Sequence, residues 1–495
     1  MQRVTPDRPW PLHAVAAIRR LEQRAAAALP PHTLMQRAGL AVARLAIAVA
    51  PHARTIWIAC GPGNNGGDGF EAALHLKQWG KDVVVTWLGD DSRAPEDARA
   101  SLGRARAAGI TISPQPPAHW DLAIDALLGI GSTRAPEGAL LAQVQALRGG
   151  PVLAVDLPSG LDADTGHAGA VVRATHTLSL LALKPGLFTA HGRDAAGTVW
   201  FDDLQVAAQD EAPCAFLAPP PPAPARPHAS HKGTHGDVAV IGGAPGMAGA
   251  VLLAARAALH HGAGRVFAGF LDAAAPALDA RQPDLMVRPW DGLDLRGMAV
   301  ACGCGGGAAV HAALPRVLAA RALVLDADAL NAVAADAQLQ ALLAARGRRG
   351  APTVLTPHPL EAARLLATDT ASVQADRLAA ARQLAQRFAC TVVLKGSGTV
   401  IAAPDGAMHI NSTGNARLAI AGTGDVLAGM TAARLASGED AFAAASGAVY
   451  LHGLAADRWP ADVPLTAAAL ALSPPGFGFA LTTGLRENTG SRRSG

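Results

Sequence analysis

Aromatic residues, a strong charge of either sign and long apolar runs are all scarce in this sequence of 495 residues. Tyrosine occurs once and phenylalanine ten times, only 16% of the residues are charged, and the formal net charge is +3. So balanced a charge argues against a protein that binds nucleic acid or a membrane surface. No run of about 18 purely apolar residues occurs, which argues against a transmembrane helix. Proline and charged residues interrupt the N-terminus before any apolar run, so we expect no secretory signal peptide.

Cysteine is also rare, with five residues in the whole chain. An odd and sparse set does not form a disulfide framework. Cys302 and Cys304 form one Cys-x-Cys pair, but a zinc site usually needs about four ligands and no second pair exists. We therefore expect a protein of the reducing cytoplasm without structural zinc.

The length predicts two domains, because a single core rarely grows beyond about 250–300 residues. A proline-rich run at residues 218–227 divides the chain into halves of similar size, and proline there stiffens the segment and cannot donate to a helix or sheet. We predict a first domain over 1–215, a linker over 216–229, a second domain over 230–482 and a flexible tail over 483–495.

Both halves alternate short apolar strands with helical segments. Strands are predicted at 55–60, 83–88, 122–126, 152–155 and 177–181 and then at 238–241, 265–268, 298–301, 323–326, 353–355 and 391–394. Helices are predicted at 12–29, 33–49, 71–79, 95–108 and 139–147 and then at 247–261, 359–366, 372–388 and 424–436. This alternation predicts two α/β domains, each with a mostly parallel sheet covered on both faces. Ligands of such sheets bind beyond the carboxyl ends of the strands.

The first predicted strand runs into a loop rich in glycine, asparagine and aspartate at residues 61–69. Glycine permits close approach to a ligand, and the amides that open the next helix favour an anion. Asparagine and aspartate oxygens suit a hard cation. A plain turn is the alternative, because Asn-Gly is a strong turn dipeptide.

Two more strand ends carry carboxylates in the first half. Asp125 precedes a glycine-containing segment, and Asp156 and Ser159 follow another strand. Buried carboxylates are costly unless they serve a partner or a reaction, although each of these could instead cap a helix or form a turn.

The first half, about residues 10–210, resembles the NAD(P)H-hydrate epimerase family. The matching motifs are Met35-Gln-Arg-Ala-Gly39, Gly63-Asn-Asn-Gly-Gly-Asp68, Asp125-Ala-Leu-Leu-Gly129 and Asp156-Leu-Pro-Ser-Gly160. The resemblance implies that a potassium ion is held by Asn65, Asp125 and Ser159. It also implies that Asp156 contacts the hydrate, and a carboxylate there suits acid/base work. The other implied substrate contacts are Asn64, Asn65, Gly66, Gly67, Asp68, Gly129, Ile130, Gly131, Ser132, Thr133, Arg134 and Ala135.

The second half carries different motifs at its strand ends. A glycine loop at 242–250 leads into a helix and is by itself a weak phosphate-binding signal, and Lys395-Gly-Ser-Gly-Thr399 suits a nucleotide but does not match Walker A. The Gly422-Thr-Gly-Asp425 tetrad opens a helix whose amides can hold a phosphoryl group while Asp425 takes a hydroxyl proton. This tetrad resembles the anion hole and base of ribokinase-like kinases. His358 could donate to a substrate, and Asp326 could lie near phosphates or a metal.

Residues 228–480 together resemble the ADP/ATP-dependent NAD(P)H-hydrate dehydratase family, a branch of the ribokinase-like fold. The resemblance implies a Rossmann-like three-layer first domain and a ribokinase-like three-layer second domain, with ADP as co-substrate accompanied by magnesium. Implied hydrate contacts are Ala250, Gly305, Gly307, His358 and Asp425, with Asp425 as the base. Implied nucleotide contacts are Lys395, Gly396, Ser397, Gly398, Thr399 and Gly424. The family usually has proline where Cys304 stands here, so we expect a more flexible loop.

The two resemblances predict a bifunctional enzyme that repairs hydrated NADH and NADPH. The first half would interconvert the R and S hydrates, and the second would dehydrate the S form while ADP is converted to AMP and phosphate. The resemblance also implies a homo-oligomer. One alternative is a ribokinase-like small-molecule kinase with a non-catalytic nucleotide-binding first domain. Another is a first half that only senses a nucleotide or scaffolds partners, which the cluster of Asn65 and Asp156 argues against.

Overall fold

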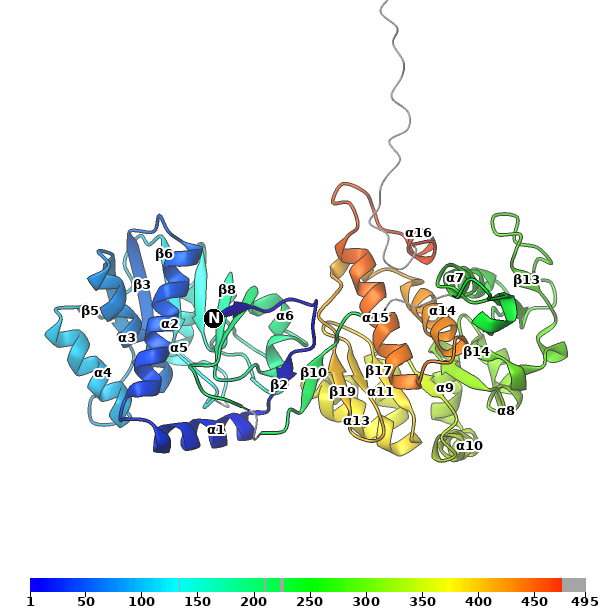
Figure 1. Ribbon diagram of the computed structural model, residues 1–495, viewed down its shortest axis with the longest axis horizontal. Coiled ribbons are helices and arrows are strands. Elements are labelled where there is room, and N and C mark those ends of the chain that lie inside the picture. The colour runs from blue at the N-terminus through cyan, green and yellow to red at the C-terminus, as the bar shows by residue number, and fades with distance from the viewer. Residues whose placement is uncertain (133, 209–210, 223–226, 474–495) are drawn as a thin grey trace, which may run out of the picture.

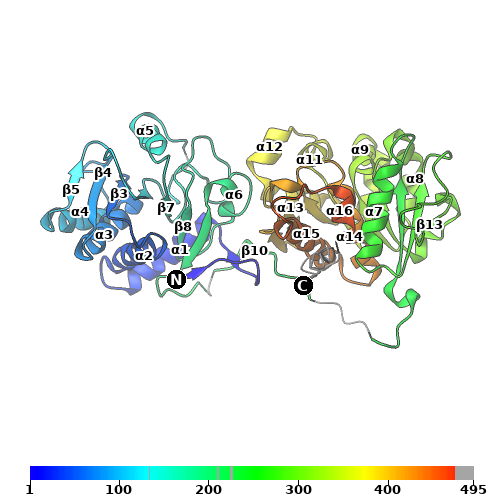
Figure 2. The ribbon, with the colours of Figure 1, turned by 90° about the horizontal axis from the view of Figure 1, so that it is seen from above.

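The computed structural model describes residues 1–132, 134–208, 211–222 and 227–473. Two α/β bodies lie side by side, with the first half of the chain in one and most of the second half in the other (Figures 1 and 2). No helix in this described part of the chain is long and apolar enough to cross a membrane. Residues 223–226 of the predicted linker and the whole predicted tail at 483–495 lie outside the described residues.

The first sheet has eight strands in the order β1-β9-β8-β7-β6-β3-β4-β5, parallel except at the edge strand β1. In that order the strands are Gln2–Arg3, Thr198–Asp202, His176–Leu180, Val152–Val155, Leu122–Ala126, Thr55–Cys60, Asp82–Trp87 and Thr111–Ser113. The helices are α1 (Val15–Ala28), α2 (Thr33–Val49), α3 (Asn64–Gln78), α4 (Glu96–Ala107), α5 (Gly138–Ala146) and α6 (Gly192–Ala195). Apolar residues of α1 to α4 pack on one face, and α5 packs on the other, which makes three layers.

The second sheet has eleven strands in the order β13-β12-β11-β14-β15-β16-β17-β18-β19-β10-β2. In that order they are Met286–Val287, Arg265–Phe270, Asp237–Gly242, Ala299–Cys302, Ala322–Leu325, Thr353–Leu355, Thr391–Leu394, Val400–Ala402, Met408–Ile410, Ala215–Leu217 and Pro11–Leu12. The ladder is parallel from β13 to β17, and β18 is antiparallel to both of its neighbours. The predicted fold class, two α/β domains with Rossmann-like and ribokinase-like three-layer architectures, is confirmed.

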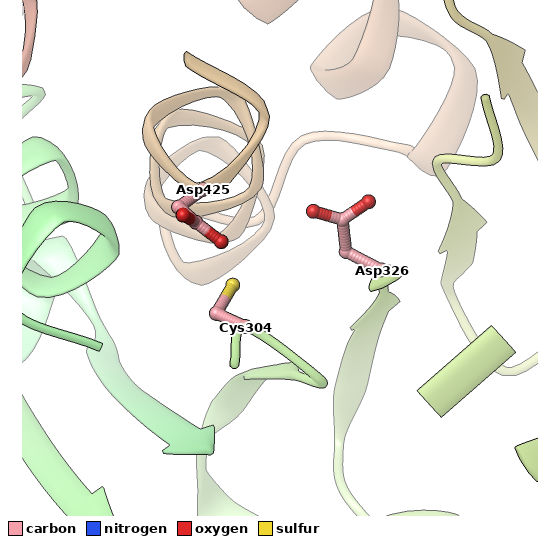
Figure 3. A group of neighbouring side chains, drawn as sticks. All are labelled: Cys304, Asp326 and Asp425. Atoms are coloured by element: carbon pink, nitrogen blue, oxygen red, sulfur yellow. The ribbon is translucent and has the colours of Figure 1, made fainter. Parts of the chain in front are cut away.

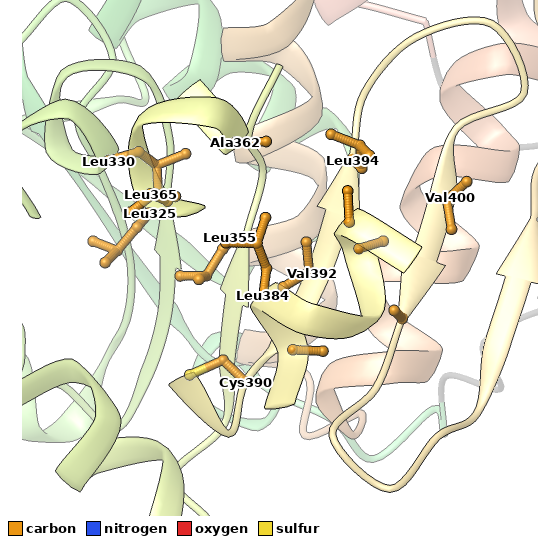
Figure 4. Close-up of a cluster of buried hydrophobic side chains, with 14 of the residues drawn as sticks. Leu325, Leu330, Leu355, Ala362, Leu365, Leu384, Cys390, Val392, Leu394 and Val400 are labelled. Carbon is orange, nitrogen blue, oxygen red and sulfur yellow. The ribbon is translucent and has the colours of Figure 1, made fainter. Parts of the chain in front are cut away.

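Helices cover both faces of the second sheet. One face carries α8 (Val310–Val317), α9 (Ala327–Ala335), α10 (Ala337–Arg348), α11 (Pro359–Leu366), α12 (Thr370–Ala375) and α13 (Arg377–Phe388). The other carries α7 (Ala248–His260), α14 (Thr423–Ala436), α15 (Ala441–Asp457) and α16 (Ala467–Ala471). Figure 4 shows part of the core between the second sheet and helices α8 to α13. Leu325, Leu355 and Val392 of three adjacent strands lie there near Leu330 and Leu384 of the helices.

Three predicted helices have different bounds in the structure. The helix expected at 12–29 begins only at Val15, because Pro11–Leu12 form strand β2. The helix expected at 71–79 begins at Asn64, so the glycine-rich loop is largely the first two turns of α3. The helix expected at 372–388 is two helices, since Asp376 leaves helical geometry and its side chain caps α13.

Glycine occurs in the first turns of α3 despite its low helix propensity, because neighbouring backbone and side chains leave no room for a larger residue there. A Cβ on Gly66 would lie 2.1 Å from the carbonyl oxygen of Gly61, and one on Gly67 would lie 2.5 Å from the sulfur of Met35. Likewise, Gly39 of α2 lies so close to α3 that its Cβ would be 2.1 Å from Cβ of Glu71. These glycines therefore allow α2, α3 and the end of β3 to pack closely around the first site.

The two halves are joined through the second sheet. Strand β10 pairs with β19, and β2, from the start of the chain, pairs antiparallel with β10. The apolar core on one face of this sheet also includes side chains of the first half, among them Leu157, Leu183 and Phe188. The contact between the halves is therefore continuous with the core of the second domain.

Candidate active sites

The first half holds a cavity of about 510 Å³ at the carboxyl ends of β3, β6, β7 and β8. Strand ends meet there because the sheet is parallel, as expected from the sequence. The predicted residues that line it are Asn64, Asn65, Asp68, Gly129, Ile130, Gly131, Ser132 and Asp156. Gly66 and Gly67 are buried in the first turn of α3 and do not line it. Thr133 lies outside the described residues.

Asp156 follows β7 in the left-handed region, at φ 68°. Aspartate adopts this region more readily than most residues, and such strained geometry often occurs at functional sites. Oxygen Oδ1 accepts from the backbone N–H of Leu180 at 3.1 Å and forms an ion pair with the ammonium of Lys184. No hydrogen bond among the described residues engages Oδ2, so this oxygen remains available to a ligand in the cavity.

Lys184 is fully buried and has an acceptor for each of its three protons. Besides Asp156, the ammonium donates to Oγ of Ser179 at 3.2 Å and to the carbonyl oxygen of Leu180 at 2.8 Å. With every proton engaged, this side chain fixes the position of Asp156 and does not itself offer a proton to a ligand.

Two further carboxylates face the same cavity. Burial raises the pKa of Asp68 well above its ordinary value, and the neighbouring Asp156 raises it further. Burial also raises the pKa of Glu22, on α1, with Asp156 again the next cause. In this cavity Asp156 is therefore held by a cation, whereas for Asp68 and Glu22 the raised pKa favours the protonated form.

Asp125, at the end of β6, is fully buried and forms no ion pair with any described residue. Ser159 donates to it from its backbone N–H at 2.8 Å and from Oγ at 2.6 Å. Burial raises the pKa of Asp125 to about 6 despite these hydrogen bonds. Asn65 donates from Nδ2 to the carbonyl of Leu128 at 3.1 Å, which leaves its amide oxygen free to face a cation. This set of oxygen atoms can hold a metal ion.

A second cavity, of about 400 Å³, adjoins the first, and residues 128–132, which follow β6, line parts of both. Gly129 and Ser132 line both cavities, and the predicted contacts Arg134 and Ala135 line only this second one. Ala375 of the second half also lines it, so it lies between the two halves.

The second half brings Asp425, Asp326 and Cys304 together (Figure 3). One side-chain ligand atom of each lies within 4.8 Å of the others. The three come from the first turn of α14, the end of β15 and the loop after β14. Asp326 accepts from the ammonium of Lys395 at 2.6 Å and from Oγ1 of Thr356 at 2.8 Å.

The environment raises the pKa of Asp425 to about 6. Burial is the largest cause, and the neighbouring negative charge of Asp326 is the next. Cys304 is fully buried, and burial raises the pKa of its thiol well above the ordinary value. A carboxylate that is ionised at neutral pH but more basic than usual is suited to accept a proton.

Of the small residues predicted as contacts in the second half, Gly424 lies beside Asp326 and Lys395, and Gly305 directly follows Cys304. A Cβ on Gly424 would lie 3.4 Å from Nζ of Lys395, and one on Gly305 would lie 3.0 Å from Cβ of Ala250. Gly307 donates its N–H to Asp328 at 2.8 Å. Helix α14 starts at Thr423 with Gly422 in the left-handed region, and its free N-terminal amides can bind an anion. The expected flexibility of the loop at Cys304 stays a prediction.

His358, predicted as a substrate contact, also caps the N-terminus of helix α11. Its Nδ1 accepts from the backbone N–H groups of Leu360 and Glu361, so it caps α11, and Glu361 returns a bond to the N–H of His358. Burial lowers the pKa of His358, and the nearby Lys395 lowers it further. The lowered pKa favours the neutral ring, and Nε2 lies 3.2 Å from Oε1 of Glu361.

The predicted nucleotide loop, Lys395 to Thr399, contacts both the acidic group around Asp425 and the first half of the chain. Lys395 reaches the Asp326 carboxylate beside Asp425. Ser397 and Gly398, in contrast, contact the first half of the chain: Ser397 donates to the carbonyl of Ala190 at 3.0 Å. Thr399 donates to the carbonyl of Gly396 at 3.0 Å, within the loop.

Sequence reasoning missed Lys184, and it placed Asp326 only near phosphates or a metal, without a role in the reaction. The signal for Lys184 is a single cation after a long apolar strand, directly before a Pro-Gly pair. For Asp326 it is an acid at the end of a buried strand, as for Asp125 and Asp156. In both cases the partner is distant in the sequence, and no spacing reveals it.

Comparison with known proteins identifies both halves. A family profile described as NAD(P)H-hydrate dehydratase matches residues 238–474, and one described as YjeF-related protein N-terminus matches residues 31–186. The chain is 46% identical over 255 residues to the ADP-dependent (S)-NAD(P)H-hydrate dehydratase of Neisseria meningitidis serogroup B, covering 50% of this chain and 85% of that protein. The solved ADP/ATP-dependent NAD(P)H-hydrate dehydratase from Bacillus subtilis, co-crystallised with ATP and Mg²⁺, is 34% identical, with 50% of this chain and 91% of that chain covered and a TM-score of 0.43.

Similarity also extends over both halves at once. The bifunctional NAD(P)H-hydrate repair enzyme Nnr of Escherichia coli (strain K12) is 39% identical over 464 residues, which cover 89% of this chain and 88% of that protein. A bifunctional NAD(P)H-hydrate repair enzyme of Leishmania braziliensis is 36% identical, with 87% and 85% covered. The resemblance seen in the sequence is confirmed: the chain belongs to the family of bifunctional NAD(P)H-hydrate repair enzymes.

Proposed function

We propose that the first half interconverts the R and S hydrates of NADH and NADPH, and that the second half dehydrates the S form at the expense of ADP. Membership of the bifunctional family supports this pairing and favours it over a small-molecule kinase with a non-catalytic first domain. The observation that carries the proposal is that each half gathers acidic side chains at the carboxyl ends of its parallel strands, with Asp156 held by Lys184 in the first half and Asp425 beside Asp326 in the second.

In the epimerase reaction, Asp156 accepts the hydroxyl proton of the hydrate through Oδ2. The ring bond between the hydroxyl-bearing carbon and nitrogen then opens to an aldehyde, and the nitrogen takes up a proton. Rotation and the reverse steps close the ring on its other face, and the proton returns to the new hydroxyl group. Lys184 holds Asp156 in its orientation through Oδ1. The remaining cavity residues, including Asn64, Asp68 and Gly129 to Ser132, would hold the dinucleotide.

Potassium is the cation we propose for the oxygen cluster of Asn65, Asp125 and Ser159. The buried carboxylate of Asp125 has no cationic partner among the described side chains, and a bound monovalent ion would compensate its charge. The bound ion would supply positive charge beside the segment at Gly129. It would also keep the pKa of Asp125 below the raised value caused by burial.

In the dehydratase reaction, Asp425 takes the proton of the ring hydroxyl. The hydroxyl oxygen of the hydrate attacks the terminal phosphoryl group of ADP, and AMP leaves. Elimination then breaks the carbon–oxygen bond, and the adjacent ring carbon gives up a proton to the departing phosphate, so that the new double bond restores the conjugated ring. The N-terminal amides of α14 at Gly424 would stabilise the charge that develops on the phosphoryl group. Lys395 would contribute a positive charge beside them, and Mg²⁺ would accompany the phosphates of ADP. Ala250, Gly305, Gly307 and His358 would surround the hydrate.

We propose further that the enzyme acts in the cytoplasm, because no described helix could span a membrane and the cysteines are free. A homo-oligomer is the proposed assembly, and size-exclusion chromatography with light scattering tests it: a monomeric mass would contradict it.

Single variants of the full-length enzyme test the assignment of the two activities. Asp156→Asn should abolish recovery of the R hydrate, with ADP-dependent recovery of the S hydrate within about twofold of the parent. Asp425→Asn should abolish recovery of both, while NMR of the hydrate still detects interconversion of R and S. Loss of both activities in both variants would contradict the division of labour between the halves.

A further inference from the structure

One segment of the first half, residues 183–190, contacts both proposed active sites and is called the bridging segment below. Its second residue, Lys184, holds Asp156 in the epimerase cavity. Its first residue, Leu183, pairs with Leu12 and accepts the N–H of His13 at 2.8 Å, so this end is attached to strand β2 of the second sheet. The other end, Thr189 and Ala190, meets the predicted nucleotide loop of the second half.

Hydrogen bonds fasten that loop to the bridging segment. Oγ1 of Thr189 donates to the carbonyl of Gly398 at 3.0 Å and also lies 3.3 Å from the carbonyl oxygen of Ser397. Ala190 donates its N–H to Ser397 at 3.1 Å, and Oγ of Ser397 donates back to Ala190 at 3.0 Å. Thr189 is fully buried, so its bond to Gly398 is shielded from water, whereas Ser397 is exposed.

Arg377, the first residue of α13, completes the attachment from the other side. Its Nε donates to Oγ1 of Thr189 at 3.3 Å, and its NH2 group donates to the carbonyls of Leu394 and Lys395 at 3.0 and 3.1 Å. The guanidinium is buried and forms no ion pair with any described carboxylate. Its role here is therefore to hold backbone carbonyls, and Thr189 is one of its partners.

The two glycines of the loop have positive φ and lie close to these neighbours. Gly398 has φ 60°, and a Cβ there would lie 2.0 Å from the carbonyl oxygen of Phe188 in the bridging segment. Gly396 has φ 139°, and a Cβ there would lie 2.9 Å from the guanidinium nitrogens of Arg377. Gly398 therefore packs directly against the bridging segment and Gly396 against Arg377, and neither position has room for a side chain.

We propose that Thr189 is a positioning residue for the dehydratase reaction: through Gly398, the first half of the chain holds the nucleotide loop in the conformation that binds ADP. Lys395 leaves this loop toward Asp326 and Gly424, so the attachment also sets where its ammonium lies. The proposal rests on the proposed function, in which this loop contacts ADP.

The test compares Thr189→Val, which is nearly isosteric but cannot hydrogen-bond, with Thr189→Ser, which keeps the hydroxyl. Thr177→Val is the matched control, since Thr177 is equally buried in the first half and donates to the carbonyl of Ala196 at 2.7 Å, within its own domain. Kinetic constants for ADP and for the S hydrate are measured from NADH formation. The dissociation constant for ADP is measured by calorimetry, and thermal unfolding reports stability.

We expect Thr189→Val to raise the KM and the Kd for ADP about tenfold, because a buried hydrogen-bonded partner is lost. The KM for the hydrate should stay within about twofold, and Thr189→Ser and Thr177→Val should behave like the parent. An unchanged KM for ADP in Thr189→Val, an equal rise in Thr177→Val, or no rescue by serine would overturn the proposal. If Thr189→Val unfolds, Thr189→Ala is held to the same criteria. A parent enzyme that binds no ADP would instead contradict the proposed function.

Discussion

Replacing Asp425 by asparagine removes the proposed base of the dehydratase and preserves the shape of the side chain. General-base catalysis contributes roughly 10²- to 10⁴-fold to a rate, so kcat for the S hydrate should fall by about that factor. The KM for ADP should change little, because the amides of α14 and Lys395 remain. Formation of NADH, followed at 340 nm with saturating ADP and hydrate, measures the loss.

The raised pKa of Asp425 adds a pH dependence with a definite sign. The base must be ionised, and its pKa is about 6, so the rate should be near its plateau at pH 7 and fall as the pH decreases through 6. At pH 5 roughly one molecule in ten has an ionised Asp425, which predicts about a tenfold lower rate. Asp440→Asn is the control, because Asp440 caps α15 away from the site and asparagine caps equally well. An Asp425→Asn enzyme that retains more than a tenth of the rate, or a parent rate that is flat from pH 5 to 7, would refute the assignment.

Three further changes test the other parts of the structure. Lys184→Met leaves Asp156 buried without its cation, so it should lower the free energy of unfolding by about 3 kcal/mol in thermal or denaturant melts and abolish recovery of the R hydrate; unchanged epimerisation would show that the pair is dispensable. Asp125→Asn should remove the activation of epimerisation by KCl relative to choline chloride, because the charged oxygen ligand is lost; equal activation in parent and variant would exclude this cation site. Gly398→Ala should raise the KM for ADP and destabilise the enzyme by about 1–3 kcal/mol, whereas Gly406→Ala, also at positive φ but in open space, should cost less; equal effects would assign the loss to backbone strain alone.

The parts of the fold that the sequence predicts are those with a local physical cause. Strands such as Val152–Val155 are buried on both faces, so each is a continuous apolar run that can be recognised without its neighbours. The first turns of α3 were not predicted, since glycine disfavours a helix and only the crowding by Gly61 and Met35 explains it. Strands β2 and β10 are too short to carry a pattern. Strand β10 pairs with β19 and with β2, and each of these partners lies about 200 residues away from it along the chain.

The candidate sites divide in the same way. Asp125, Asp156 and Asp425 were found because carboxylates at strand ends or helix starts have a local signature. Their partners were harder to find: Lys184 meets Asp156, and Lys395 meets Asp326 across 69 positions of sequence. The contact of Thr189 with Gly398 spans 209 positions, and only the packing of one half against the other produces it.

The most direct test of the central claim is absorbance at 340 nm after the purified full-length chain is mixed with ADP, Mg²⁺ and K⁺ and with each separated hydrate epimer. The account predicts recovery of NADH from both epimers, dependent on ADP, and an Asp156→Asn variant that recovers NADH from the S epimer alone. No recovery from either epimer, with ADP or with ATP, would contradict it.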